Sequence, residues 1–222
     1  MSDESLEDAL RRTDPDRWMS SRFIADPQAR ADAVAIYAFD GELARAPHAS
    51  SNTIVSEMRL AWWREVLDEV FEGRAVRRHP VAEALAGTIG RRGLAREALE
   101  TMIDARYREL EPQPMSAEEA LAWAKNSGGQ AAQVVAGLLD PTTQAGLSGS
   151  AGAAWILARR LPSQPELAPV VEALLRQARA EVGSLSTEAF PAVAHAALVR
   201  RPARSDLVRR LRITWAVLLG RV

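Results

Sequence analysis

Apolar side chains recur every three or four residues along most of the chain, which is the spacing that places them on one face of an α-helix. After Pro27, a residue suited to a first helical turn, one such face is predicted to comprise Ala31, Val34, Ala35 and Ala38. Ser51–Asn52 can cap the next helix and Gly73 can end it. In that helix we expect a buried stripe and an outer acidic face, respectively Leu60, Trp63, Leu67, Val70 and Phe71, and Glu65, Asp68, Glu69 and Glu72.

The remaining apolar patterns predict further helices, and glycine or proline separates them. The expected ranges are 80–91, 94–111, 116–138, 143–160, 165–182, 187–200 and 203–220. Runs of β-branched residues are scarce, the linkers are short, and neither a repeat nor a change in composition marks a boundary. We therefore expect one all-α domain over residues 1–222, built as a helical bundle.

Two stretches are rich in small residues, one around Gly128–Gly129 and one around Gly149–Gly152. A phosphate-binding loop would follow a strand and end in Gly-Lys-Ser/Thr, and neither stretch does. We interpret both as places where helix backbones pack closely.

Composition removes several kinds of chemistry. Among the 222 residues there is no cysteine, which excludes disulfides and thiolate nucleophiles. Lys125 is the only lysine, and the histidines His48, His79 and His195 lack metal-ligand spacing. The net charge of −1 does not favour nucleic acid as a partner. No apolar stretch has the length of a membrane span and the N-terminus does not resemble a signal peptide, so a cytoplasmic protein is expected.

Charge and apolarity combine at the C-terminal end, where residues 198–222 contain seven arginines and one acid. Two interpretations of its apolar stripe remain open: it covers the bundle core, or it contacts anionic lipid or a membrane partner. The stripe and its basic neighbours are Leu207, Val208, Leu211, Trp215, Leu218 and Leu219, with Arg204, Arg209, Arg210 and Arg212.

Several short motifs, taken in order, resemble the squalene/phytoene synthase family, whose members are all-α isoprenoid synthases that join two prenyl diphosphates head to head. The motifs are Asp16-Arg17, Phe23 to Arg30, Tyr37-Ala38-Phe39, Arg59-Leu60 with Trp62-Trp63-Arg64, Met102-Ile103-Asp104 with Glu109-Leu110, Trp123 to Gly129, and Gly149 to Pro162. The resemblance covers most of the chain. It implies a bundle of the isoprenoid synthase type, shortened in the C-terminal half after Pro162.

The acids that the family's reaction requires are missing. The family places carboxylates four residues apart on two facing helices, where they hold Mg²⁺ against the substrate diphosphates. Counting from Tyr37, the first motif would fall at Ala44, Arg45 and His48, and Pro47 disfavours helical geometry at Ala46. Residues 154–160, at the second motif, contain no acid.

The pattern of Phe39, Glu42-Leu43-Ala44 and Arg59…Trp62-Trp63 is similar to a non-catalytic branch of the family, which includes an assembly factor for respiratory complex I. The resemblance therefore implies a catalytically inactive protein that binds a partner, such as a respiratory complex subunit or assembly protein. One alternative is an active, Mg²⁺-dependent prenyl transferase with a rearranged site, which would use Asp40, Asp104 and Glu109 with Arg45, Arg106 or Arg159. Another is a module that binds a prenyl chain or lipid without chemistry.

We expect no catalytic residue, no metal ligand and no cofactor. A vestigial pocket is predicted from seven residues, namely Tyr37, Asp40, Ala44, Arg45, Asp104, Trp155 and Arg159. Contacts with a partner or lipid are predicted at Trp62, Arg209, Arg210 and Arg212, with peripheral attachment to the inner membrane. Asp40 and Arg45 are also candidates for simple ion pairs, and His195 for a structural histidine.

Overall fold

A computed structural model, which describes residues 5–50, 52–200 and 205–222, folds as a bundle of α-helices with no strand in those ranges. The prediction of an all-α fold is thus confirmed. The helices are α1 (Leu6–Thr13), α2 (Pro15–Ser21), α3 (Pro27–Arg45), α4 (Thr53–Phe71), α5 (Pro80–Arg92), α6 (Arg96–Tyr107), α7 (Ala117–Ala124), α8 (Gln130–Leu139), α9 (Gly149–Ala158), α10 (Ala168–Glu181) and α11 (Asp206–Leu219).

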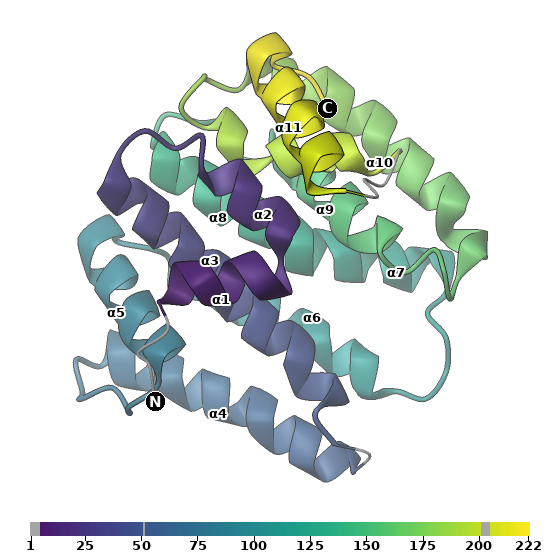
Figure 1. Cartoon of the computed structure of the whole chain (residues 1–222). Helices are drawn as coiled ribbons and strands as arrows, with labels where there is room; N and C mark the ends of the chain where they lie inside the picture. Colours follow the sequence, from purple (N-terminus) through teal and green to yellow (C-terminus); the bar gives the residue numbers. More distant parts are fainter. Residues whose placement is uncertain (1–4, 51, 201–204) are drawn as a thin grey trace.

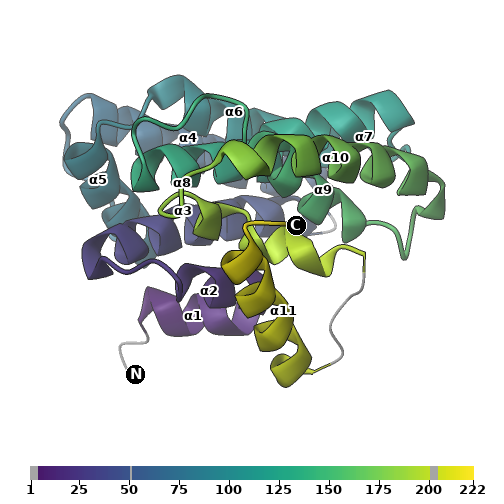
Figure 2. The ribbon, with the colours of Figure 1, turned by 90° about the horizontal axis from the view of Figure 1, so that it is seen from above.

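Helix α3 runs through the centre of the bundle and packs against α1, α5 and α8 (Figure 1). Seen from above, α1, α2 and α11 lie on one side of α3, and α4, α5 and α6 lie on the other (Figure 2). The two groups are separated by the middle layer that α3 forms with α8, α9 and α10 (Figure 2). Side chains in the middle of α3 can therefore contact helices of both groups.

Local sequence explains where α3 begins and ends. The side chain of Asp26 accepts from the backbone N–H of Ala29, and Pro27 fills the first turn. Burial extends around most of the helix, but Ala31, which the predicted face included, is exposed. The helix ends at Arg45, but the prediction that Ala46 leaves helical geometry is wrong. Ala46 stays helical because a 3₁₀ turn, Ala46–His48, accommodates the proline.

Helix α4 follows most of its predicted pattern, although Val70 and Phe71 of the expected stripe are only half-buried. Asn52 caps it, Ser51 lies outside the described residues, and Gly73 follows its end with φ of 69°. Glu69 was expected on the solvent side, but it is buried. Its carboxylate accepts from the backbone N–H of Arg77 and from the Arg77 side chain, whose Nε lies 2.8 Å away. These charge-assisted hydrogen bonds make the burial of the carboxylate tolerable.

Close helix packing at the small-residue stretches is present. A five-residue π-helix, Lys125–Gly129, joins α7 to α8 and packs against α9. A Cβ atom on Gly152 would lie 2.3 Å from the carbonyl oxygen of Gly128. Only glycine allows the two backbones to approach this closely.

The C-terminal half departs from the predicted ranges. The helix expected over 143–160 begins only at Gly149, after turns that include Gly146 at φ of 96°. The helix expected over 187–200 is replaced by two 3₁₀ turns, Phe190–Ala192 and Ala194–Leu198. Residues 189–196 and Leu198 are buried, so tertiary packing determines the backbone of these turns. Helices α1 and α2 were not anticipated, although Ser5 and Asp14 cap them.

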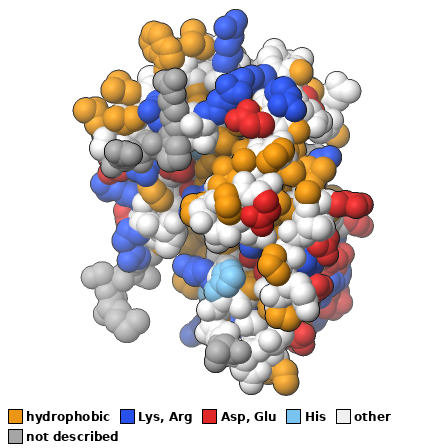
Figure 3. Space-filling model, turned by 90° about the vertical axis from the view of Figure 1, so that its right-hand side faces the viewer, with side chains coloured by type: hydrophobic (Ala, Val, Ile, Leu, Met, Phe, Trp, Pro, Cys, Tyr) orange, Lys and Arg blue, Asp and Glu red, His pale blue; other side chains and the backbone are white. Residues whose placement is uncertain are grey.

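The apolar stripe of α11 does not cover the core, which corrects one of the two interpretations left open. Leu207, Leu211, Trp215 and Leu218 are 67%, 61%, 63% and 70% exposed. The core contacts come instead from Ile213 and Ala216. Hydrophobic side chains gather at the upper left of Figure 3, where α11 lies. Arg204, predicted beside this stripe, lies outside the described residues. Within the described part of the chain, no helix is long and apolar enough to cross a bilayer.

Candidate functional site

Asp40 lies in the middle of α3 and is enclosed by two arginines from other helices. Arg17 of α2 and Arg106 of α6 each donate to it, over 2.6 Å, and all three side chains are at most 2% exposed. Burial alone would raise the pKa of Asp40, but the charges of Arg106 and Arg17 lower it to about 2. The carboxylate is therefore ionised and held on both oxygens.

Glu109, in the 3₁₀ turn after α6, continues this arrangement. Arg106 donates to it over 2.9 Å and the indole of Trp123 over 3.0 Å. Arg160, just after α9, pairs with its second oxygen, and His48 Nε2 lies 3.5 Å from the same atom. The result is a continuous series Arg17–Asp40–Arg106–Glu109–Arg160, hereafter the arginine–carboxylate chain. It sets three guanidinium groups against two carboxylates and ties α2, α3, α6 and the end of α9 together.

Aromatic rings surround the Arg17 end of the arginine–carboxylate chain. The guanidinium of Arg17 lies 4.2 Å from the ring centre of Trp155 and 5.1 Å from that of Tyr37. His195 packs edge-on against Trp155 and Tyr37, with ring centres 4.9 and 6.2 Å apart. Burial, reinforced by the charges of Arg17 and Arg159, holds the pKa of His195 well below its usual value. His195 is thus a neutral packing residue, as the apolar sequence around it indicates.

Six of the seven predicted pocket residues line one cavity of about 360 Å³, beside the arginine–carboxylate chain. They are Tyr37, Asp40, Ala44, Arg45, Trp155 and Arg159. Asp104 is not among them: it is exposed on α6 and pairs with Arg64 of α4. Arg45 pairs with Glu42 one turn earlier. The structure thus brings the six together and leaves Asp104 on the outer surface.

Several lining residues, among them Asp14 and Arg17, were not assigned to the cavity from the sequence, and neither were Asp16 and Arg160 close by. Asp16 accepts from the Trp155 indole over 3.3 Å and from Arg209 over 2.6 Å. Asp16-Arg17 belongs to the quoted motifs, which was the one available signal. No spacing rule, however, predicts that Arg17 meets an acid 23 residues away.

The predicted contact residues have different surroundings. Arg209 is mostly buried and forms ion pairs with Asp16 and Asp206, so it is part of the structure that holds α11 in place. Arg210 is exposed and Arg212 is half-buried. Trp62 is half-buried under the guanidinium of Arg77, 5.2 Å from its ring centre.

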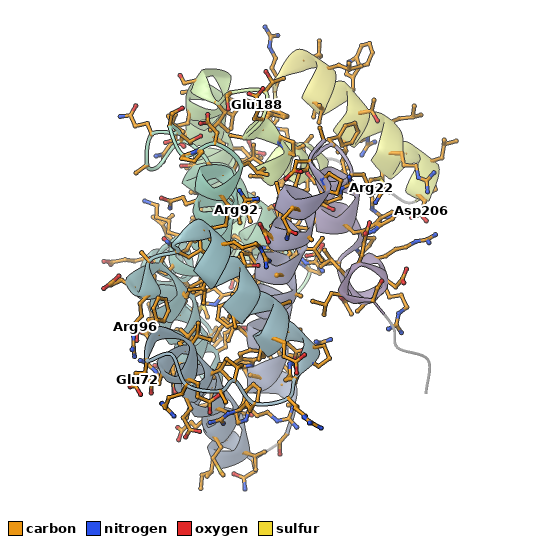
Figure 4. All side chains as sticks on the ribbon, turned by 90° about the vertical axis from the view of Figure 1, so that its left-hand side faces the viewer. Arg22, Glu72, Arg92, Arg96, Glu188 and Asp206 are labelled. Carbon is orange, nitrogen blue, oxygen red and sulfur yellow. The ribbon has the colours of Figure 1, made fainter. Side chains whose placement is uncertain are left out.

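A second buried acid on α3 lies outside the cavity. Asp32 accepts from Arg91 over 2.6 Å and from Arg92 over 2.7 Å. Arg92 is labelled in Figure 4, where it lies beside α3 and away from Arg96 and Glu72 at the outer edge. This cluster fastens α5 to α3 and takes no part in the pocket.

The acids of this site do not fit a Mg²⁺ ion. Both oxygens of Asp40 and both of Glu109 already accept from arginine or tryptophan. No group of three or more potential ligands among the described side chains could hold a metal. A hard divalent cation needs several converging oxygens, and here each carboxylate faces positive charge instead.

Comparisons with known proteins agree with this fold. A family model described as squalene/phytoene synthase matches residues 10–166. The structure is similar to that of squalene synthase HpnC from Alicyclobacillus acidocaldarius, with a TM-score of 0.68 and 14% identity. That match covers 97% of this chain and 92% of the other, so any shortening relative to it is small. At this identity the likeness establishes the fold alone.

A curated protein shows a more local similarity. The NADH dehydrogenase (ubiquinone) complex I, assembly factor 6 homolog of Dictyostelium discoideum is 29% identical over 87 residues. The aligned segment is 39% of this chain and 24% of that protein. This chain therefore matches about a quarter of the length of that relative.

Proposed function

The chain belongs to the squalene/phytoene synthase family, and we propose that it is a member that performs no prenyl transfer and acts by binding a protein partner. The partner would be a subunit or assembly protein of a membrane respiratory complex. On this proposal the protein is cytoplasmic and is held at the inner membrane peripherally. It uses no cofactor.

The arginine–carboxylate chain is the observation that carries this proposal. The reaction of the family depends on stabilising the charge of a departing diphosphate, which is commonly the largest catalytic contribution. Here the inward-facing acids Asp40 and Glu109 are each paired with two arginines, of which Arg17 and Arg106 are buried. Freeing either carboxylate for Mg²⁺ would leave arginine charge uncompensated in the core, at a high cost. The site supports a structural role for these groups.

Complex I is the specific version of the proposal. It is supported by the similarity to the Dictyostelium assembly factor homologue, across the 87 aligned residues. The exposed apolar face of α11 supplies a contact surface, because large exposed apolar patches mark interaction sites. Arg210 on the same helix would meet anionic headgroups or an acidic partner, with Arg212 and Trp62 as further contacts.

Prenyl or lipid binding without chemistry is the second candidate, and it is favoured by the 360 Å³ cavity beside Tyr37 and Trp155. It is compatible with partner binding. Prenyl transfer at a rearranged site, the remaining alternative, loses one of its proposed ligands, because Asp104 lies outside the cavity.

Diphosphate release tests the proposal directly. The protein is incubated with farnesyl or geranylgeranyl diphosphate, with and without Mg²⁺, beside an authentic synthase. We expect no release while the control is active. Metal-dependent release would overturn the proposal and show that an arrangement other than the acids described here performs the chemistry.

Partner binding needs its own experiment. The tagged protein is purified from detergent-solubilised membranes, and the recovered proteins are identified by mass spectrometry. We expect respiratory-chain subunits or assembly proteins to be enriched over a tagged control protein. Recovery of neither class would count against the assembly role, whatever the outcome with the prenyl diphosphates.

A further inference from the structure

A second cavity, of about 550 Å³, lies beside α4 and differs in character from the first. Its wall is formed by the end of α3, the following 3₁₀ turn, α4 and His79 before α5. We call it the α4 cavity. It adjoins the first cavity at Glu42, Ala44 and Arg45, whereas Arg59 and Trp62 line only the α4 cavity. Its volume is within the range of small-molecule sites.

Arg59 is a cation of this wall that has no acidic partner. The residue is exposed, and its side chain forms no ion pair or hydrogen bond with any described residue. Arg45, the other arginine of the cavity, pairs with Glu42, the only acid there. The charges of Arg45 and Glu42 therefore cancel, and Arg59 leaves the cavity positive. A free guanidinium presents a planar fork of donors that matches a carboxylate or phosphate.

An aromatic wall faces these polar groups. The rings of Trp62 and Trp63 lie 4.8 Å apart, and each is 5.4 Å from the ring of His79. One turn earlier on α4, Met58 is 65% exposed, and Ile54 before it is 64% exposed. Residues four apart share a helix face, so Met58 extends the apolar surface of Trp62 beyond the cavity.

We infer that the α4 cavity binds an organic anion, whose carboxylate or phosphate group is held by Arg59 while its flat or apolar body lies against Trp62. The cavity offers a binding surface for each part of such a ligand. The guanidinium without an acid accounts for the anion, and the tryptophan wall beside exposed Met58 accounts for the body. The cavity includes Trp62, one of the proposed partner contacts, and the first-motif positions Ala44, Arg45 and His48, but the inferred binding involves no prenyl transfer and needs no metal.

The test uses 1-naphthyl phosphate as probe, with binding to the full chain followed by isothermal titration calorimetry. We expect saturable binding of one molecule per chain. Inorganic phosphate lacks the ring and 1-naphthol lacks the charge, so each should bind at least about tenfold more weakly. Arg59→Gln should weaken the probe by about tenfold or more, since a charge-assisted hydrogen bond is lost. Arg59→Lys should recover part of the affinity, because the charge remains.

Arg159→Gln is the matched control, because Arg159 is a partly exposed arginine that lines the first cavity and not the second. It should leave probe binding unchanged. Circular dichroism and urea unfolding establish that each variant folds, as expected for replacements at exposed positions. Absence of saturable binding, equal affinity in Arg59→Gln, or loss in Arg159→Gln instead would overturn the inference. Equal affinity for inorganic phosphate would overturn its apolar part.

Discussion

Asp40 and Asp104 show how the surroundings of one residue type determine its role. Asp40 is shared by two buried arginines, whereas Asp104 and Arg64 form an ion pair in solvent. We predict that Asp40→Ala lowers the free energy of unfolding by about 3–5 kcal/mol, because Arg17 and Arg106 lose their buried counter-charge. Asp104→Ala should change it by less than about 1 kcal/mol. Urea denaturation measures both, and similar losses for the two variants would contradict the assignment of Asp40 to the arginine–carboxylate chain.

His195 should make the stability of the chain depend on pH. Its pKa is held well below the ordinary value by burial, so the folded state keeps the imidazole neutral where the unfolded state takes up a proton near pH 6.5. The unfolded state then binds more protons, and the free energy of unfolding falls as the pH decreases from about 7.5 to 5.5. The slope from one such group is at most about 1.4 kcal/mol per pH unit.

His195→Gln tests this effect, because glutamine does not titrate. Urea unfolding at several pH values should give a flatter profile for this variant than for the natural sequence. His48→Gln is the control, since the side chain of His48 is 69% exposed. A profile for His195→Gln as steep as that of the natural sequence would show that other groups cause the dependence.

Among the helices, those with local signals were predicted well. Helix α5 has proline in its first turn and Gly93 after its last residue, and both ends lie within one residue of the expected 80–91. Signals of this kind act within one or two turns, so sequence alone carries them. The segment 187–200 lacks such one-sided patterning and is packed between other elements. Its 3₁₀ turns therefore depend on contacts that are distant in sequence.

The candidate site, too, could be predicted from the sequence only in part. The order of family-like motifs was enough to name Tyr37, Asp40 and Trp155, which line one cavity. The arginine partners were not predictable as a set, because Asp40 meets residues 23 and 66 positions away. Asp104 was misplaced for a related reason. Helical spacing alone did not determine that its face of α6 turns outward to Arg64 of α4.

Contact between α9 and the π-helix Lys125–Gly129 leads to a prediction about glycine. At Gly152 an added Cβ would meet the carbonyl oxygen of Gly128 at 2.3 Å, a backbone atom that cannot move alone. Gly152→Ala should therefore lower the free energy of unfolding by about 1–3 kcal/mol or more. Gly137→Ala is the control, because it is exposed in α8 with nothing within 4 Å of an added Cβ. It should raise stability by about 0.5–1 kcal/mol. Thermal and urea unfolding distinguish the two, and a tolerated Gly152→Ala would contradict the close packing.

At the scale of the whole molecule, the bundle buries the ion pairs of Asp40 and of Arg106 with Glu109, and it leaves other ion pairs and an apolar surface exposed. The exposed apolar side chains lie mainly on α11. Helix α11 is anchored from one side only, through Ile213, Ala216 and the ion pair of Arg209 with Asp16. Its outer face is therefore available without unfolding any other part of the bundle. This arrangement separates the surface proposed for contact from the 360 Å³ cavity.

We predict that the double variant Leu211→Ser, Trp215→Ser keeps the stability of the bundle but loses attachment to membranes. Both side chains are more than 60% exposed, so each replacement should change the free energy of unfolding by no more than about 0.5 kcal/mol. The measurement is flotation with vesicles of phosphatidylcholine and phosphatidylglycerol. The natural sequence should float in low salt and less in high salt, because Arg210 meets anionic headgroups while the apolar side chains insert.

Vesicles of phosphatidylcholine alone are the control. If the natural sequence does not float with anionic vesicles, the lipid role is refuted. Loss of the co-purified respiratory proteins in the same double variant would then assign this face to a protein partner.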